Sequence, residues 1–162
     1  MSNLTNMGAA VGELLKERNE TVAVSESSSG GLVSAALLAI PGASAYFMGG
    51  GVVYTHRARE TLLKINFDDH PGVRSSSEPY AELAAATIRD RLGANWGLAE
   101  SGAAGPTGNR YGDAAGHTCI AVAGPIKRVL TLETGLENRD RNMWLFAEKT
   151  LATIEEALRA AG

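Results

Sequence analysis

A short apolar segment in this chain runs into a glycine-rich turn and then into a helix. Residues 21–25 are typical of a strand, the small polar run 26–31 ends in two glycines, and residues 32–40 continue as a helix until Pro41-Gly42. A second strand, 96–100, also runs into a glycine loop. Strands that alternate with helices indicate a layered α/β domain.

The other predicted elements continue this alternation. Residues 117–123 and 129–134 are typical of two strands joined by the turn Gly124-Pro125. Because a tight turn makes two strands antiparallel, we expect a mixed sheet. A capping-box spacing at Ser75 to Glu78 precedes a helix with Pro79 in its first turn. The remaining predictions are helices over 3–18, 57–65, 79–92 and 142–160 and extended segments over 45–48 and 51–55.

The length of 162 residues suits one domain, 1–162, and we find no internal repeat or linker. Glycine is the unusual component, because 19 of the 162 residues are glycine, about 12% where about 7% is typical. Many of these glycines gather at residues 30–31, 49–51 and 102–116. Clustered glycine predicts particular loops with close backbone approaches rather than general flexibility.

Charge and histidine placement argue against several classes of function. Fifteen Lys and Arg against 18 Asp and Glu give a net charge of −3 with the signs interspersed, whereas a nucleic-acid binder shows a basic face. His56, His70 and His117 are scattered, and no CxxC or HExxH spacing occurs, so no metal site is expected.

The lone cysteine and the hydropathy pattern indicate a cytoplasmic protein. Cys119 lies in an apolar run and is interpreted as a buried structural thiol in a reducing compartment. No segment approaches the ~18 apolar residues of a membrane span, and the start of the chain has no secretory pattern. We therefore expect neither a membrane nor a nucleic acid as a partner.

Two loops follow strands in positions where α/β proteins bind ligands. Helix N-termini beyond the carboxyl ends of strands present free N–H groups, and residues 25–31 and 101–109 have this placement. Gly30 and Gly31 let backbone N–H groups approach an anion such as a phosphate, while Ser27, Ser28 and Ser29 supply hydroxyls. The alternative is that these serines simply cap a helix.

Two further features favour chemistry at these loops. Glu26 beside the serines resembles the setting of an activated nucleophile, which needs a base and oxyanion donors. After the glycine triplet, Tyr54, His56, Arg57 and Arg59 offer a phenol, an imidazole and two guanidinium groups. The alternatives are that the triplet marks a β-bulge and that the arginines are solvated helix charges.

Together these segments resemble the C-terminal domain of the competence/damage-inducible CinA family, whose stand-alone members include nicotinamide mononucleotide deamidases. The matches keep their order and spacing from about residue 3 to residue 158. The family patterns A-E-S-C-T-G-G, P-G-S-S-A-x-F, G-x-V-x-Y-S-N-E-A-K, V-S-E, T-G-I-A-G-P-x-G and G-T-V are similar to segments 25–31, 41–47, 51–59, 76–78, 101–108 and 116–118.

The resemblance implies a three-layer α/β/α fold with a mixed sheet and no cofactor or metal. It implies an amidase that converts the carboxamide of a pyridine nucleotide to a carboxylate with release of ammonia. Ser27 is then the nucleophile, with Tyr54 and position 59 as its partners. A homo-oligomer is also implied, and the chain has no room for the additional N-terminal domain of larger members. The implied substrate-binding residues are Glu26, Ser28, Ser29, Gly30, Gly31, Gly50, Gly51, Ser101, Gly102, Ala104, Gly105 and Arg141.

One departure from the family pattern bears directly on the chemistry. The lysine that ends Y-S-N-E-A-K is Arg59 here, and a guanidinium stays protonated and only donates hydrogen bonds. His56, three residues earlier, is a substitute base, since an imidazole changes charge near neutral pH. The sequence therefore leaves two hypotheses open: an amidase with an altered base, and a catalytically silent paralogue that binds a nucleotide or another small anion.

Three smaller departures follow, and the last of them removes a cationic group. The family Cys-Thr pair is Ser28-Ser29, and the loop threonine is Ser101. The pattern G-D-R-x-x-V-R is blurred, so that Arg141 matches the first arginine and Leu145 the second. Arg59, Arg141 and the glycine-loop N–H groups are then expected to bind the ligand.

Overall fold

The computed structural model describes residues 3–162, so the first two residues of the predicted domain lie outside the described range. A five-stranded sheet in the order β2-β1-β3-β4-β5 forms its middle layer. Strands β1, β2 and β3 are parallel, whereas β4 runs antiparallel to β3 and β5. The predicted mixed sheet is confirmed. The strands are β1 (Val22–Glu26), β2 (Phe47–Val52), β3 (Trp96–Ala103), β4 (His117–Ala123) and β5 (Arg128–Glu133).

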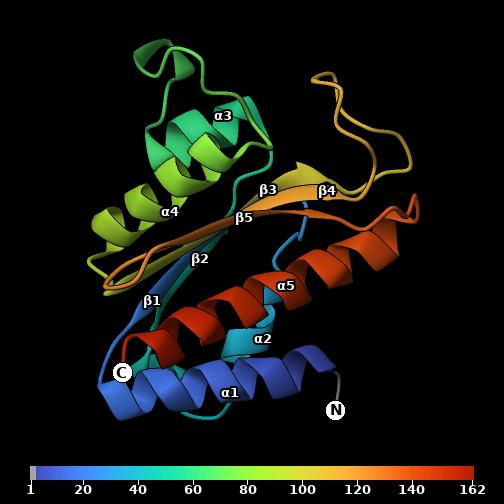
Figure 1. Ribbon diagram of the computed structural model, residues 1–162. Helices are drawn as coiled ribbons and strands as arrows, with labels where there is room; N and C mark the ends of the chain where they lie inside the picture. The colour runs from blue at the N-terminus through green and yellow to red at the C-terminus, as the bar shows by residue number, and fades with distance from the viewer. Residues whose placement is uncertain (1–2) are drawn as a thin grey trace.

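Helices cover both faces of the sheet and complete three layers (Figure 1). α1 (Asn3–Arg18), α2 (Leu32–Leu38) and α5 (Arg139–Ala160) pack together on one face. α4 (Glu78–Leu92) covers the other face, with the short α3 (His56–Ala58) beside it. The predicted α/β/α sandwich is confirmed.

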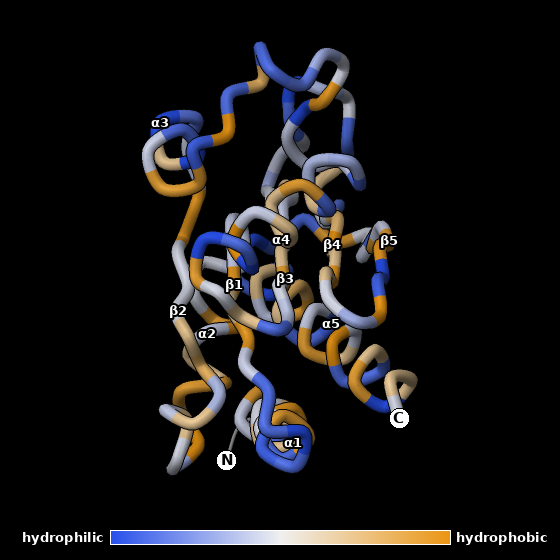
Figure 2. The backbone as a smooth tube through the Cα atoms, turned by 90° about the vertical axis from the view of Figure 1, so that its left-hand side faces the viewer, coloured by the Kyte–Doolittle hydropathy of each residue, from blue (hydrophilic) through white to orange (hydrophobic). Residues whose placement is uncertain are grey.

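Two hydrophobic cores, one on each side of the sheet, explain this layering. In the central strands, alternate side chains point to opposite faces: Val22 and Val24 of β1 join the core under α1, α2 and α5, while Ala23 joins the core under α4. Figure 2 shows hydrophobic residues in both strands and helices, and mostly hydrophilic residues in the loops at the top of the view. β1 and β4 are buried along their whole length, as strands covered on both faces must be.

Several boundaries differ from those predicted. The glycine triplet does not divide the extended segment in two, because β2 runs through it as one strand. The third strand continues past residue 100 to Ala103, so part of the expected loop is strand. α4 is capped by Ser77, whose hydroxyl accepts from Tyr80 N, rather than by Ser75. The predicted helix 57–65 consists of α3 and a π-helical turn, Arg59–Leu63.

None of the helices within residues 3–162 is both long and apolar enough to cross a membrane.

Candidate functional site

The carboxyl ends of three neighbouring parallel strands meet at one edge of the sheet and form a pocket. Ser27 follows β1, Tyr54 follows β2 and Ser101 lies near the end of β3. α2 and α4 leave this edge on opposite faces, which is the arrangement that opens a crevice in α/β sheets. The pocket has a volume of about 220 Å³. Its lining residues are Ser27, Val53, Tyr54, Thr55, His56, Arg59, Ser75, Ser76, Tyr80, Ser101 and Gly102. We call it the Ser27–Arg59 pocket.

Ser27 stands at the tight turn between β1 and α2. The turn is closed by a hydrogen bond from Gly30 N to Ser27 O (3.1 Å), and Ser27 N donates to Oε1 of Glu100 (3.1 Å). In the described part of the chain, no hydrogen bond occupies the Ser27 hydroxyl, and Ser27 is one of the residues that line the pocket. The hydroxyl is therefore available to a ligand, whereas the Ser27 backbone N–H is already bound.

Glu26 has a different role from that of a base beside the nucleophile. Its carboxylate is 1% exposed and lies at the start of α2. It accepts hydrogen bonds from the backbone N–H groups of Gly31 (3.1 Å), Val33 (3.0 Å) and Ser34 (2.8 Å). These are N–H groups of the first turn that have no partner inside the helix. Glu26 thus satisfies the N-terminus of α2, and it does not line the Ser27–Arg59 pocket.

Glu100 holds the serine turn from the neighbouring strand. This buried carboxylate accepts from Ser29 N (2.8 Å) and from the hydroxyls of Ser28 and Thr118 (2.8 Å for Thr118). Ser28 and Ser29 are therefore turned inward, away from the pocket lining. No sequence motif pointed to Glu100, which the parallel pairing of Ser25 with Ala99 places beside Glu26.

Arg59 is the buried cation of the pocket. The residue is 4% exposed, and its guanidinium carbon lies 3.5 Å from the centre of the Phe67 ring. Nε donates to the carbonyl of Ile65 (3.4 Å), while the nearest carboxylate, on the exposed Glu60, is 3.9 Å from Nη2. Phe67 in turn packs edge-on against Tyr80, with ring centres 5.4 Å apart. Aromatic stacking therefore fixes the guanidinium in the pocket wall.

Tyr80 is a neutral hydroxyl of the same wall. Burial raises the pKa of its phenol to about 12, against the opposing effect of the Arg59 charge. At neutral pH the Tyr80 phenol is therefore protonated, and it offers one donor and one acceptor to a ligand.

Tyr54 and His56 lie at the pocket mouth, each with an arginine. The Tyr54 hydroxyl accepts from Arg139 Nη2 (2.9 Å), and Nη1 of Arg139 donates to Gly105 O (2.6 Å). Nε2 of His56 lies 3.3 Å from Nη2 of Arg110. Because a guanidinium only donates, Nε2 must be the acceptor and the ring proton must sit on Nδ1. The free electron pair of His56 is thus occupied by Arg110.

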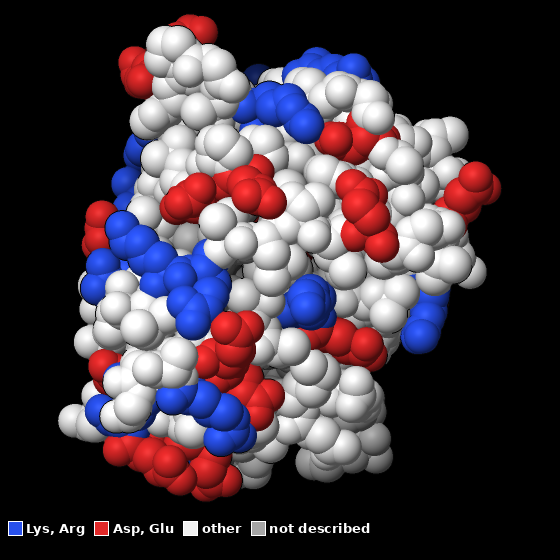
Figure 3. All heavy atoms as spheres, in the orientation of Figure 1, with Lys and Arg blue, Asp and Glu red and all other residues white. Residues whose placement is uncertain are grey.

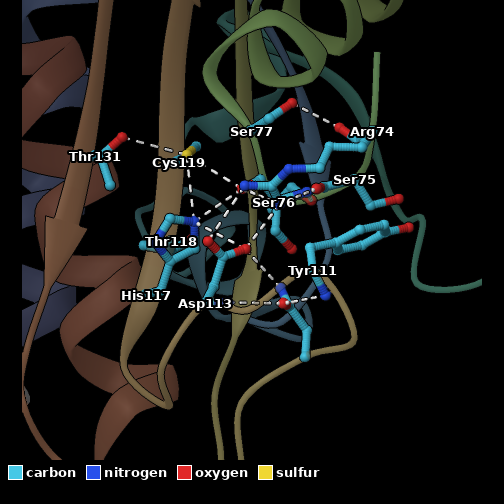
Figure 4. Close-up of polar contacts among 12 residues, drawn as sticks. Arg74, Ser75, Ser76, Ser77, Tyr111, Asp113, His117, Thr118, Cys119 and Thr131 are labelled. Carbon is cyan, nitrogen blue, oxygen red and sulfur yellow. Dashed lines mark hydrogen bonds and ion pairs between the residues drawn. The ribbon is translucent and has the colours of Figure 1, made fainter. Parts of the chain in front are cut away.

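A polar network behind the pocket positions Ser76 (Figure 4). Ser76 N donates to the Ser101 hydroxyl (3.1 Å), and Ser76 O lies 2.8 Å from Nε2 of His117. The other ring nitrogen of His117 faces Glu133, and Asp113, paired with Arg74 at 2.7 Å, lies 3.6 Å from Nε2. Burial lowers the pKa of His117, but the hydrogen bonds to Glu133 and Ser76 and the two carboxylate charges raise it above its ordinary value.

Apart from Gly102, the other residues implied by the resemblance lie outside the pocket lining. In the turn before α2, Gly30 and Gly31 have φ angles of 66° and 100°. Residues that carry a side chain rarely adopt these angles. Gly102 lines the pocket, and a Cβ there would meet the backbone of His117. Gly50 and Gly51 lie within β2, and Ala104 O accepts from Asn142 (2.8 Å).

Arg141 lies exposed in the first turn of α5, outside the pocket lining. Its neighbour Arg139, two residues earlier, is instead the α5 cation that reaches Tyr54. The sequence did not predict Arg139, Arg110 and Phe67 as residues of the site, because their contacts depend on how distant loops are placed. Within residues 3–162, no group of three or more His, Cys, Asp or Glu side chains is arranged to hold a metal ion.

Comparison with known proteins identifies the family. The family model of the CinA C-terminal domain matches residues 4–158. A CinA-like protein of Prochlorococcus marinus is 42% identical over 120 residues, which are 74% of this chain and 28% of the relative. A CinA-like protein of Desulfosudis oleivorans is 39% identical over 155 residues, 93% of this chain and 37% of the relative. This chain thus spans about a third of the length of these relatives.

A crystal structure of a CinA superfamily protein from Klebsiella pneumoniae has the same fold. The two structures superpose with a TM-score of 0.91 at 22% identity, over 98% of this chain and 99% of the other. Motifs, fold and family model agree, and the chain belongs to the CinA C-terminal domain family.

Proposed function

We propose that this chain binds a small anion of the pyridine-nucleotide class in the Ser27–Arg59 pocket. One observation carries the proposal: a guanidinium that is 4% exposed lines the pocket, and its nearest carboxylate is too far away for a hydrogen bond. A buried charge without a close counter-ion is costly, so an anionic ligand would stabilise it. The ligand class comes from the motif resemblance to the nicotinamide mononucleotide deamidases.

The chain's overall field does not supply this attraction. On the face shown in Figure 3, Lys and Arg side chains alternate with Asp and Glu, as a net charge of −3 with mixed signs would suggest. Arg59 inside the pocket and Arg139 and Arg110 at its mouth are therefore the cations that act on a ligand.

Amide hydrolysis at the same site is the second candidate, and the unoccupied Ser27 hydroxyl favours it. In this reaction the Ser27 oxygen attacks the carboxamide carbon, ammonia leaves with the serine proton, and water then releases the acid. The step needs a group to take the serine proton. Arg59 only donates, Tyr80 keeps its proton at neutral pH, and Nε2 of His56 is occupied by Arg110. Binding without turnover is therefore the better supported function.

Calorimetric titration with nicotinate mononucleotide and nicotinamide mononucleotide tests binding. We expect at least one to bind the wild type and to bind Arg59→Gln at least about tenfold more weakly, because a charge-assisted hydrogen bond contributes about 1.5–3 kcal/mol. Arg57→Gln is the matched control, since Arg57 is an exposed cation two residues away that does not line the pocket. Wild-type protein that binds neither nucleotide would contradict the proposal.

An ammonia-release assay with nicotinamide mononucleotide separates the two candidates. We expect no release by the wild type, and release by Arg59→Lys if the missing lysine is what silences the site. Wild-type activity that disappears in Ser27→Ala would establish the amidase instead. His56→Ala then tells whether the imidazole is the base, since activity that survives this change would exclude it.

Three expectations stay proposals: a cytoplasmic location, a homo-oligomer, and no partner among nucleic acids and membranes. Size-exclusion chromatography with light scattering tests the oligomer directly.

A further inference from the structure

The free N–H groups of Arg59 lie on one edge of its guanidinium. One face of the group is covered by Phe67 at 3.5 Å, and Nε is bound to Ile65 O. In the described chain no hydrogen bond uses Nη1 or Nη2, and no fully buried side-chain nitrogen or oxygen lacks a partner. Nη1 and Nη2 therefore keep accessible surface, and Arg59 is a residue of the pocket lining. A ligand meets Arg59 at its edge, in the plane of the group.

This edge offers donors only. A planar carboxylate presents two coplanar acceptor oxygens and fits a guanidinium edge with two parallel hydrogen bonds. The corresponding carboxamide presents one acceptor and one NH₂ donor, so its NH₂ would face an N–H of Arg59 with no acceptor between them. Sites built around a particular hydrogen-bond pattern discriminate strongly against analogues that break it.

We infer that Arg59 makes the Ser27–Arg59 pocket selective for a planar monocarboxylate over the corresponding carboxamide. The inference rests on the proposed function, because it names the chemical group that the proposed anion presents to the pocket. In pyridine-nucleotide terms, the chain binds the acid that an amidase would produce, in preference to the amide that an amidase would consume.

Size and charge place the carboxylate, and not a phosphate, at Arg59. The pocket holds about 220 Å³, below the ~300–1,000 Å³ of sites that enclose a whole drug-sized ligand, so it takes one end of a nucleotide. A monocarboxylate neutralises one buried guanidinium, whereas a phosphate dianion would leave one negative charge without a partner in the pocket. The exposed Arg139 and Arg110 at the mouth remain available to a phosphate outside the pocket.

Calorimetric titration of the full chain with the acid and amide mononucleotides at pH 7 tests the selectivity. We expect the wild type to bind nicotinate mononucleotide about tenfold or more tightly than nicotinamide mononucleotide. Arg59→Gln should bring the ratio of the two affinities close to one, because the glutamine amide offers an acceptor as well as a donor. Arg57→Gln should keep the wild-type ratio.

The outcomes separate this inference from the proposed function. Equal binding of acid and amide by the wild type overturns the inference and leaves anion binding intact, whereas binding of neither overturns both. A preference for the acid that persists unchanged in Arg59→Gln also overturns it, since another group would then select the carboxylate. Circular dichroism checks that Arg59→Gln is folded; if it is not, Arg59→Lys must lower the ratio, because a lysine lacks the planar fork.

Two fragments show which anion Arg59 holds. Nicotinate riboside has the carboxylate without the phosphate, and ribose 5-phosphate has the phosphate without the carboxylate. We expect Arg59→Gln to weaken the riboside at least about tenfold and to leave ribose 5-phosphate unchanged. The reverse result would place the phosphate at Arg59 and overturn the inference.

Discussion

Two buried glutamates hold the turn that carries Ser27, and they share one hydroxyl. Ser29 Oγ lies 2.7 Å from a carboxylate oxygen of Glu26 and 2.7 Å from one of Glu100. A hydroxyl has one proton, so it donates to one carboxylate at a time. Backbone N–H groups and the hydroxyls of Ser28 and Thr118 supply the remaining donors. The carboxylates of Glu26 and Glu100 thus accept hydrogen bonds from several donors and hold the turn in place.

Glu100→Gln tests whether the Glu100 carboxylate holds the turn that carries Ser27. The side-chain amide keeps the shape but replaces an acceptor oxygen by a donor, which then faces other donors. We expect the free energy of unfolding to fall by about 1–3 kcal/mol, the cost of unsatisfied buried polar groups, in a urea titration. Glu82→Gln, which changes an exposed carboxylate of α4, should stay within about 0.5 kcal/mol of the wild type. Equal effects of the two changes would contradict the assigned role of Glu100.

The sequence could not predict that neighbouring residues of one motif would occupy different places in the site. The motif pattern brought Ser27, Tyr54, His56, Arg59, Ser101 and Gly102 to one pocket. The same motif includes Glu26, but its carboxylate binds the first turn of α2, whereas Ser27 lines the pocket. The alternation of side chains along a strand predicts this difference between Glu26 and Ser27 only if the residue at which β1 ends is known.

At the scale of elements, long periodic segments were predicted well and glycine-rich ones were not. The helix over residues 3–18 has the predicted bounds, because apolar spacing of 3.6 residues continues along its whole length. β2 was divided into two pieces, since glycines read as a break when one sequence is considered alone. Its pairing with β1 overrides that tendency. The π-helical turn that starts at Arg59 has no sequence signal that we can name.

His117 links three elements, and its charge should make their stability depend on pH. Ser76 O accepts from Nε2, and the opposite nitrogen faces the carboxylate of Glu133, so the ring keeps both protons. Asp113 and Glu133 are the charged groups that face His117, with Arg74 behind Asp113 and the Cys119 thiol beside the ring. One imidazolium thereby joins three parts of the chain: the segment before α4, the loop before β4, and strand β5.

The sign of the pH effect follows from the raised pKa of His117. A raised pKa in the folded state stabilises the fold fully below the unfolded value of about 6.5, and the effect is lost as pH rises through the folded value. We expect His117→Gln to lower the free energy of unfolding by about 1 kcal/mol or more at about pH 5.5, and by less at about pH 9. Urea titrations at both pH values measure this. A cost of His117→Gln that stays constant between the two pH values would contradict the charged state.

At the scale of the whole molecule, one layer depends on a close contact between two helices. α1 packs against α2 and α5, and Gly8 of α1 lies against the backbone of α2. A Cβ at Gly8 would meet the carbonyl group of Ala36, with its carbon 2.7 Å away. The amphipathic pattern of α1 predicted the helix, but the need for glycine depends on where α2 lies, and that is decided by the tertiary fold.

Gly8→Ala has two opposing effects on stability, because it raises helix propensity and crowds this contact. Alanine in a helix interior is about 1 kcal/mol more favourable than glycine, whereas overpacking against rigid backbone costs about 1–3 kcal/mol. Because the clash is with main-chain atoms that cannot rotate away, we expect the steric cost to prevail and the free energy of unfolding to fall in a urea titration. Asn6→Ala, on the exposed face of the same helix, should stabilise by up to about 0.7 kcal/mol. If both alanines stabilise alike, α1 does not approach α2 this closely, and the packing of this layer would have to be revised.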